Sequence, residues 1–158
     1  MKVRVRRAEE KDIPMILELL TQVCNVHSDG RPDLFKRDEQ KYHKEELEIL
    51  LKDDTRPIFV GVDENDEVLG YGFCVLLSYE GSNVLVDRRE LYIDDLCVHE
   101  RARGLGVGKQ IFSYIKSFAK EAGCYHLTLN VWASNETAMR FYEAQGMRML
   151  KKEMEVIL

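Results

Sequence analysis

The stretch ELYIDDLCVHERARGLGVGK, residues 90–109, carries the strongest structural signal in the chain. Its first part, Glu90 to Val98, is largely apolar and predicts a strand. After the glycines, apolar residues recur at helical spacing from Val107 to Ala122, which predicts an amphipathic helix that Gly123 ends. A strand, a glycine-rich turn and a helix in this order bring free backbone N–H groups and the positive end of the helix dipole together. We therefore expect an anion to bind there.

Three phosphate-binding patterns compete for these glycines, and their spacing distinguishes them. The dinucleotide pattern G-x-G-x-x-G fails because Lys109 stands where its last glycine is required. The Walker A pattern fails because Gly108 and Lys109 are followed by Gln110 instead of Ser or Thr. The pattern that remains is R-x-x-G-x-G, formed by Arg103, Gly106 and Gly108.

Outward from this segment, hydrophobic periodicity predicts strands and helices along the rest of the chain. We expect further strands at Val3–Val5, Pro57–Val62, Val68–Leu77, His126–Val131 and Met147–Leu158, and further helices beginning at Asp12, at Asp38 (ending near Lys52) and at Asn135 (ending near Gln145). A loop at residues 28–37 separates the first two of these helices. This order of elements predicts one mixed α/β domain covering residues 1–158.

Composition argues against several classes of protein. The net charge of -5 disfavours nonspecific nucleic-acid binding, which relies on clustered Lys and Arg. No apolar stretch follows the basic N-terminus, and no run of about 18 apolar residues is present. We therefore expect a cytoplasmic protein with neither nucleic acid nor membrane as a partner. The four scattered cysteines, Cys24, Cys74, Cys97 and Cys124, suit reduced thiols.

Two downstream motifs join the R-x-x-G-x-G pattern in resembling a known family, the GNAT superfamily of N-acetyltransferases. R-x-x-G-x-G after a strand is similar to the pyrophosphate signature of that family. The motif N-x-x-A-x-x-F-Y at residues 135–142 resembles its next helix, and Gly146 ends this helix with Met147 where Phe is common. The matching pieces extend from Leu91 to the C-terminus. The resemblance implies an α/β GNAT fold, with a mixed sheet of six to seven strands flanked by about four helices.

The resemblance also implies acetyl-CoA as co-substrate, no metal, and a role for each matching residue. The pantetheine arm would lie beside the strand end formed by Leu96, Cys97 and Val98, where a backbone N–H would donate to the thioester carbonyl. The pyrophosphate would lie on the backbone of Arg103, Gly104, Leu105, Gly106, Val107, Gly108 and Lys109. Asn135 would contact the pantetheine, and Tyr142 would be the general acid that protonates the departing CoA thiolate.

A catalytic base is useful as well, because an amine with a pKa near 10.4 is mostly protonated at pH 7, which costs direct attack about 4–5 kcal/mol. The run LYIDDLCV, residues 91–98, resembles a polyamine-acetyltransferase segment that carries an acidic residue at the first aspartate position. Asp94 is therefore the candidate base. Strand alternation predicts that Asp94 lies on the face of Leu96 and Val98, with Asp95 on the other face. A hydrogen bond to backbone or to a neighbouring arginine is the alternative role of both aspartates.

Other interpretations stay open at this point. Cys97 could be a nucleophile in a ping-pong route, although a small buried hydrophobe is the better interpretation, and zinc is not expected because Cys97 and Cys124 lack a CxxC or HxxxH partner. The residues from His27 to Phe35 could contact the amine acceptor or form a solvated turn. A noncatalytic acyl-CoA-binding or sensing module is the alternative to an enzyme.

The leading hypothesis is direct acetyl transfer from acetyl-CoA to a primary amine of a small molecule or peptide. GNAT proteins often insert a loop between their last two strands, whereas residues 147–158 leave room for little more than one strand. We therefore expect a second subunit to help complete the site in a homodimer.

Overall fold

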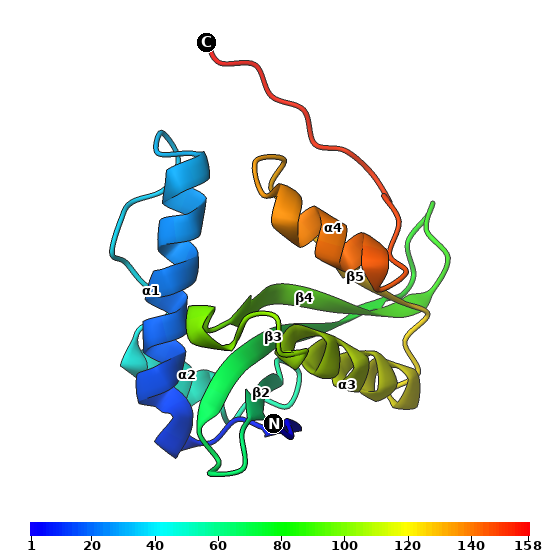
Figure 1. Cartoon of the computed structure of the whole chain (residues 1–158). Helices are drawn as coiled ribbons and strands as arrows, with labels where there is room; N and C mark the ends of the chain where they lie inside the picture. The colour runs from blue at the N-terminus through cyan, green and yellow to red at the C-terminus, as the bar shows by residue number, and fades with distance from the viewer.

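Five strands form one mixed sheet in the order β1-β2-β3-β4-β5 (Figure 1), in a computed structural model that describes residues 1–158. The strands are β1 (Arg4–Arg7), β2 (Ile58–Val62), β3 (Val68–Tyr79), β4 (Arg88–Val98) and β5 (His126–Leu129). Neighbouring strands pair antiparallel, except that β4 and β5 run parallel. A parallel pair requires a crossover connection, and helix α3 (Val107–Glu121) provides it.

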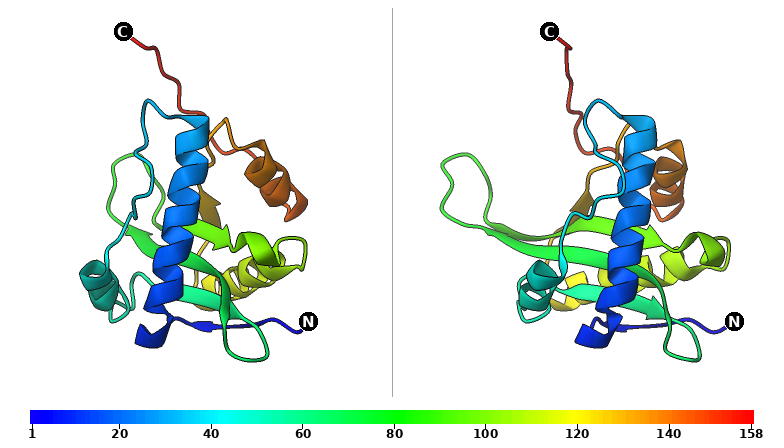
Figure 2. Two further views of the ribbon diagram at one scale, coloured as in Figure 1. Left: turned by 60° about the vertical axis from the view of Figure 1, so that its left-hand side comes forward. Right: turned by 90° about the vertical axis from the view of Figure 1, so that its left-hand side faces the viewer.

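Helices cover both faces of the sheet (Figures 1 and 2). Besides α3, they are α1 (Ile13–Gly30), α2 (Lys44–Leu50) and α4 (Glu136–Ala144), with 3-10 turns at Glu10–Asp12 and Glu100–Ala102. On one face, α1 and α2 bury an apolar cluster that includes Leu20 and Leu47. On the other face, α3 and α4 contribute Ile111 and Phe141 to a second cluster. The expected α/β architecture with four helices is confirmed.

Three glycines in the central strands bring α3 close to the sheet. A Cβ atom added to Gly72 would lie 2.5 Å from Cδ1 of Ile115, and one added to Gly61 or Gly70 would lie 3.1 Å from Cδ1 of Ile111. Both isoleucines are fully buried. The close approach therefore lets Ile111 and Ile115 of α3 leave water completely. The helix predicted after the glycine-rich turn is confirmed, and it ends one residue earlier than expected.

The pairing of β3 with β4 contains a β-bulge at the two aspartates. Phe73 lies opposite Asp95, and the next residue of β3, Cys74, lies opposite Ile93. Asp94 is therefore the extra residue of β4, with no partner in the ladder. An extra residue changes which side chains share a face on the two sides of the bulge.

Because of this bulge, Asp94 and Asp95 lie on the same face of the sheet. Both form hydrogen bonds with tyrosines that belong to, or pack against, the cluster beneath α1 and α2. Leu96 and Val98 pack against the opposite cluster, beneath α3. The prediction that Asp94 shares the face of Leu96 and Val98 is therefore wrong, because strict alternation does not continue through a bulge.

Strand β4 extends beyond the point where β5 pairs with it. The ladder between them runs from Glu90 opposite His126 to Ile93 opposite Leu129. Residues 94–98 of β4 consequently have no strand beside them on that edge. Their backbone groups on this side are open to another partner.

The predicted C-terminal strand is absent, and the sheet has five strands instead of six to seven. The last backbone hydrogen bond of the chain runs from the N–H of Met147 to the carbonyl of Tyr142 at 3.1 Å. Residues 148–158 are in neither helix nor strand. A strand needs a neighbour for its backbone groups, and the tail reaches none within its own chain.

Two helix boundaries also differ from the prediction. Helix α1 continues to Gly30, so the loop begins near residue 31 instead of 28. Asp38 does not open α2, because its φ of 57° is left-handed. Helix α2 begins at Lys44, where His43 and Glu46 form a capping box. No helix combines the length and apolar composition needed to cross a membrane.

Candidate functional site

The backbone N–H groups at the start of α3 are free to bind a ligand. None of those from Gly104 to Lys109 donates a hydrogen bond within the protein, and the first to do so is that of Gln110, to the carbonyl of Gly106 at 3.1 Å. Gly104 and Gly106 have φ values of 77° and 80°, which glycine adopts without strain. These free donors lie at the positive end of a 15-residue helix. The turn therefore has the chemistry of an anion site.

Gly108 is required for a different reason, which is close packing. A Cβ atom added to it would lie 3.3 Å from Cζ of Phe141 and 3.4 Å from Cγ2 of Val98. The first turn of α3 thus lies directly against the end of β4 and against α4. Three cationic side chains near this turn are exposed: Arg101, Arg103 and Lys109. They add positive charge around the free N–H groups.

The end of β4 places alternate side chains in different environments. Cys97 is buried beneath α1, with its sulfur 3.8 Å from the carbonyl oxygen of Leu19. Burial raises the pKa of the Cys97 thiol to about 12, which makes it a poor nucleophile at neutral pH. The interpretation of Cys97 as a buried apolar residue is confirmed. Gln22 of α1 holds the strand end by donating to the carbonyl of Val98 at 3.0 Å.

Tyr142 on α4 has a hydroxyl that makes no hydrogen bond within the protein. Its ring packs beside Phe112 and Phe141, at centroid distances of 6.3 and 5.2 Å. Burial, together with the nearby charges of Asp95 and Cys97, raises the pKa of the Tyr142 hydroxyl well above its ordinary value. The hydroxyl is therefore protonated at neutral pH and available to donate to a ligand.

Asn135 caps helix α4. Its Oδ1 accepts a hydrogen bond from the N–H of Ala138 at 3.1 Å. Its side-chain nitrogen has no partner in the protein, so capping leaves a donor free. Asn135 therefore orients the helix that carries Tyr142 two turns further on, and it retains a group that can contact a ligand.

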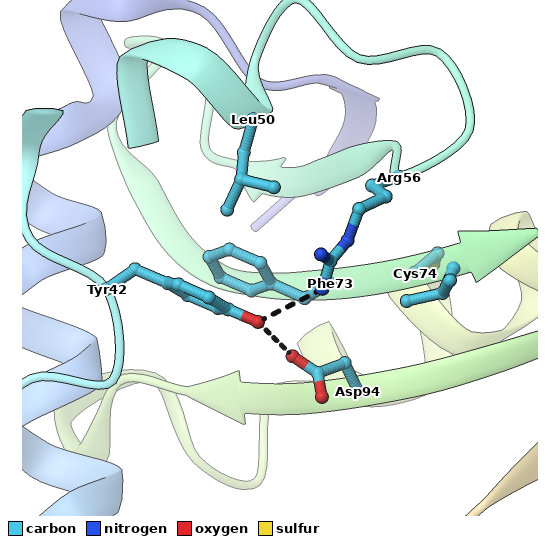
Figure 3. A pocket seen from close by; sticks show the side chains of 7 residues that line it. Tyr42, Leu50, Arg56, Phe73, Cys74 and Asp94 are labelled. Atoms are coloured by element: carbon cyan, nitrogen blue, oxygen red, sulfur yellow. Dashed lines mark hydrogen bonds between the residues drawn. The ribbon is translucent and has the colours of Figure 1, made fainter. Parts of the chain in front are cut away.

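Asp94 is held by two residues that precede α2, of which Figure 3 shows Tyr42. Lys41 donates to its Oδ1 at 2.8 Å, and the hydroxyl of Tyr42 donates to its Oδ2 at 2.7 Å. Arg56 in turn donates to the Tyr42 hydroxyl at 3.4 Å. Both carboxylate oxygens of Asp94 thus accept hydrogen bonds. This supports a structural role for Asp94, the alternative to its role as the base.

Asp95 has one side-chain partner, the hydroxyl of Tyr71, which donates to Oδ2 at 2.6 Å. Burial raises the pKa of the Asp95 carboxyl to about 6, although the Tyr71 hydrogen bond acts in the opposite direction. A carboxylate with this pKa is ionised at pH 7 and accepts a proton more readily than an ordinary aspartate. Asp95 therefore has the properties of a general base.

A small hollow lies between Tyr42, Arg56 and Asp94 (Figure 3). It leaves no space for a water molecule. The Tyr42 ring stacks on Phe73 with a centroid distance of 5.3 Å. The arrangement is therefore a packed contact that fixes the segment before α2 onto the sheet, and it is not itself a ligand cavity.

Three aromatic side chains from distant segments meet near the end of α1. The ring of Phe35 lies 4.9 Å from that of His27 and 5.0 Å from that of Trp132, measured between centroids. A Cβ atom on Gly30 would meet the Ser134 hydroxyl at 2.5 Å, so α1 abuts the connection between β5 and α4. The loop expected to contact the acceptor thus lies beside the segment that leads to Tyr142.

Sequence reasoning missed Lys41, Tyr42, Tyr71 and Trp132. Each makes its contact with a partner more than 20 positions away in the chain, and none lies in a recognisable motif. The alternation of β3 could have placed Tyr71 on the same face as Phe73. No group of three or more His, Cys, Asp or Glu side chains is arranged to hold a metal ion.

Comparisons with known proteins agree on one family. A model described as the acetyltransferase (GNAT) family matches residues 9–147. Thialysine N-epsilon-acetyltransferase of Bos taurus is 29% identical over 155 residues, covering 91% of this chain and 83% of the bovine protein. A probable glucosamine 6-phosphate N-acetyltransferase of Drosophila melanogaster is 27% identical, and the match covers 92% of this chain and 60% of that protein. A mutant form of the BH1408 protein of Bacillus halodurans has a similar solved structure, with a TM-score of 0.94 and 31% identity over 98% of this chain and 99% of that one.

Proposed function

This chain belongs to the acetyltransferase (GNAT) family, and we propose that it transfers the acetyl group of acetyl-CoA directly to a primary amine of a small molecule or peptide. The observation that carries the proposal is that two kinds of free hydrogen-bond donor lie around the end of β4. The N–H groups from Gly104 to Lys109 suit a pyrophosphate, and the unpaired hydroxyl of Tyr142 suits a departing thiolate.

The donor substrate would follow the unpaired edge of β4. Its pyrophosphate would accept hydrogen bonds from the turn at residues 104–109, with Arg103 and Lys109 adding charge. Its pantetheine amides would pair with the backbone of Leu96 to Val98. They would take the place of a neighbouring strand there, because β5 pairs with β4 only as far as Ile93. The free side-chain nitrogen of Asn135 would contact the same arm. Residues that fit acetyl-CoA thus extend along one edge of the strand and into α3.

The transfer forms one C–N bond and breaks one C–S bond. The neutral amine nitrogen attacks the thioester carbonyl carbon while a backbone N–H near Val98 donates to the carbonyl oxygen, where negative charge develops. Tyr142 gives its proton to the departing sulfur, and the proton lost by the amine passes to a carboxylate. Both groups then exchange protons with solvent, which returns the enzyme to its starting state.

Asp95 is the stronger candidate for the base, and Asp94 is the alternative. Asp95 has an oxygen without a side-chain partner and a pKa raised to about 6. Its charge also contributes to the raised pKa of the Tyr142 hydroxyl. Asp94 could act as base only if Lys41 or Tyr42 moved away from it.

A cationic small molecule is the acceptor class that the charges favour. The chain has a net charge of -5, and two adjacent carboxylates, Asp94 and Asp95, lie on one face of β4. The name of the bovine relative refers to the amine-bearing acceptor thialysine. Electrostatic steering would raise the rate at which a positively charged amine enters the site.

The proposal is tested by measuring thiol release from acetyl-CoA across a panel of amines. The panel contains thialysine, lysine, glucosamine 6-phosphate, polyamines, aminoglycosides and peptides with free N-termini. We expect saturable thiol release with at least one amine, and an N-acetylated product by mass spectrometry. Saturable acetyl-CoA binding by calorimetry without acetylation of any amine would instead support the noncatalytic acyl-CoA-binding alternative.

A further inference from the structure

Lys41, in the segment between α1 and α2, places a primary amine against a carboxylate of β4. Its Nζ donates to Oδ1 of Asp94 at 2.8 Å and makes no other hydrogen bond. The side chain of Lys41 is 49% exposed, whereas that of Asp94 is 15% exposed. An ammonium that solvent can reach is thus bound to a largely buried carboxylate.

The carboxylate that Lys41 binds is one of the two to which we assign attraction of the acceptor. Asp94 and Asp95 lie on the same face of β4, and Asp95 has an oxygen without a side-chain partner. The proposed acceptor is a cationic primary amine, and the candidate base is Asp95. Lys41 therefore carries the functional group of the proposed acceptor and holds it beside the base.

The charge of Lys41 acts on two parts of the proposed site. Burial raises the pKa of the Asp95 carboxyl to about 6, and the positive charge of Lys41 is one of the influences that oppose this rise. Burial also lowers the pKa of His27, and the charge of Lys41 lowers it further. The same ammonium thus influences the candidate base and the aromatic cluster at the end of α1.

The contacts of Lys41 allow its side chain to change position. The next residue, Tyr42, anchors the segment by stacking on Phe73 with a centroid distance of 5.3 Å. Lys41 has instead one half-exposed ion pair, a kind of contact that contributes little to stability. Its flexible four-carbon stem lets the ammonium leave one carboxylate for another while the backbone stays in place. The amine of Lys41 can therefore move from Asp94 towards Asp95.

We propose that Lys41 is a self-acetylation site, at which the protein transfers the acetyl group of its own bound acetyl-CoA to Nζ of Lys41. The inference rests on the proposed function, because it uses the same donor and the same catalytic groups. It goes beyond that function by naming an acceptor within the chain. The product is an amide without charge, which can no longer form the ion pair with Asp94.

The step forms one C–N bond and breaks one C–S bond. The ammonium of Lys41 first loses a proton to solvent, and the neutral Nζ attacks the thioester carbonyl carbon. A second proton passes from this nitrogen to Asp95, and Tyr142 gives its proton to the departing sulfur. Exchange with solvent restores Asp95 and Tyr142. The products are acetylated Lys41, the CoA thiol and one released proton.

Lys44 provides an internal reference for uncatalysed acetylation. It lies three residues after Lys41 and is 67% exposed, and its Nζ lies 3.9 Å from Glu48, one turn further along α2. It has no contact with the proposed site. Free acetyl-CoA can thus reach Lys44 at least as easily as Lys41, so faster acetylation of Lys41 reports the site.

The experiment incubates the full-length protein with acetyl-CoA and no added amine, and follows each lysine by peptide mass spectrometry. We expect Lys41 to be acetylated about 10²-fold faster than Lys44, the lower end of what general acid-base catalysis contributes. The rate at Lys41 should saturate with acetyl-CoA and fall when desulfo-CoA occupies the donor site. The rate per molecule should not change on dilution of the protein. Equal rates at the two lysines, a linear dependence on acetyl-CoA or a rate that rises with protein concentration would overturn the proposal.

A matched pair of variants checks that the modified amine is that of Lys41. Lys41→Arg keeps a cation for Asp94 and removes the primary amine, so saturable acetylation of the protein should disappear. Lys44→Arg, the control, should retain it. Saturable acetylation that persists in Lys41→Arg would refute the assignment. An unmodified Lys41 in a protein that acetylates an added amine would refute self-acetylation alone, whereas failure of both reactions would contradict the proposed function as well.

Discussion

The hydroxyl of Tyr71 donates a 2.6 Å hydrogen bond to the carboxylate of Asp95, and both residues belong to adjacent central strands. Tyr71 is fully buried, so this contact is rigid. The neighbouring Asp94 has an equivalent contact with Tyr42, but that tyrosine comes from a loop. One aspartate is thus held from within the sheet and the other by a segment outside it. This difference separates the roles we assign to them.

Replacement of Asp95 should remove the base. We expect Asp95→Asn to lower turnover by about 10²–10⁴-fold, the usual contribution of a general base, while the amide oxygen still accepts from Tyr71. In the unsubstituted enzyme the pKa of about 6 should appear as an acidic limb, with activity falling as pH drops below it. Steady-state rates from pH 5 to 9 check both effects. An unchanged acidic limb in Asp95→Asn would contradict the assignment.

Stability provides the control for this variant. Because the pKa of Asp95 is raised on folding, its neutral form favours the folded state, and this contribution is fully present below pH about 4 and lost as pH rises through about 6. At pH 8 an uncharged asparagine should therefore melt at a temperature equal to or above that of the unsubstituted protein. A large decrease in melting temperature would show that lost activity reflects misfolding.

Tyr142→Phe tests the general acid. It keeps the ring between Phe112 and Phe141 and removes only the unpaired hydroxyl. We expect turnover to fall by about 10²-fold with little change in acetyl-CoA affinity, because the hydroxyl acts on the leaving sulfur. Tyr125→Phe, which changes a tyrosine that is 80% exposed, is the matched control and should keep full turnover. Unchanged turnover in Tyr142→Phe would contradict the assignment of Tyr142 as the general acid.

The strand-turn-helix of residues 90–121 could be predicted from sequence because its signals are local. The spacing of Gly106 and Gly108, the helical period of the residues after them and the terminating Gly123 all lie within one short segment. The same holds for the cap at Asn135, although its bond to Ala138 gives it a structural role that the motif alone did not indicate.

The surroundings of the two aspartates could not be predicted in this way. The bulge depends on how β3 and β4 pair, and the sequence of neither strand alone indicates it. The contacts of Lys41 and Tyr42 with Asp94 cross more than 50 positions. The C-terminal strand was predicted from its alternation, but a strand forms only where its backbone pairs with a neighbour, and the tail pairs with none in this structure.

Gly106→Ala tests the turn. The φ of 80° should cost an alanine about 1–2 kcal/mol, although nothing lies within 4 Å of the added Cβ. We expect a lower melting temperature and an acetyl-CoA KM raised by at least threefold, because the N–H donors shift. Gly81→Ala is the matched control, since Gly81 has a φ of 72° and equally open surroundings in the loop between β3 and β4. It should lose similar stability and keep the KM; a shared KM change would point to general destabilisation.

Tyr42→Phe tests which of the two aspartates, Asp94 or Asp95, is the catalytic base. The variant keeps the stack on Phe73 and removes the hydroxyl that donates to Asp94. A hydrogen bond to a charged group contributes about 1.5–3 kcal/mol, so unfolding by denaturant should require correspondingly less urea. If Asp95 is the base, the acidic limb near pH 6 should stay in place, because the bond to Tyr71 is untouched. A limb that moves in Tyr42→Phe, but not in the control Tyr114→Phe, would instead show that Asp94 takes the proton from the amine.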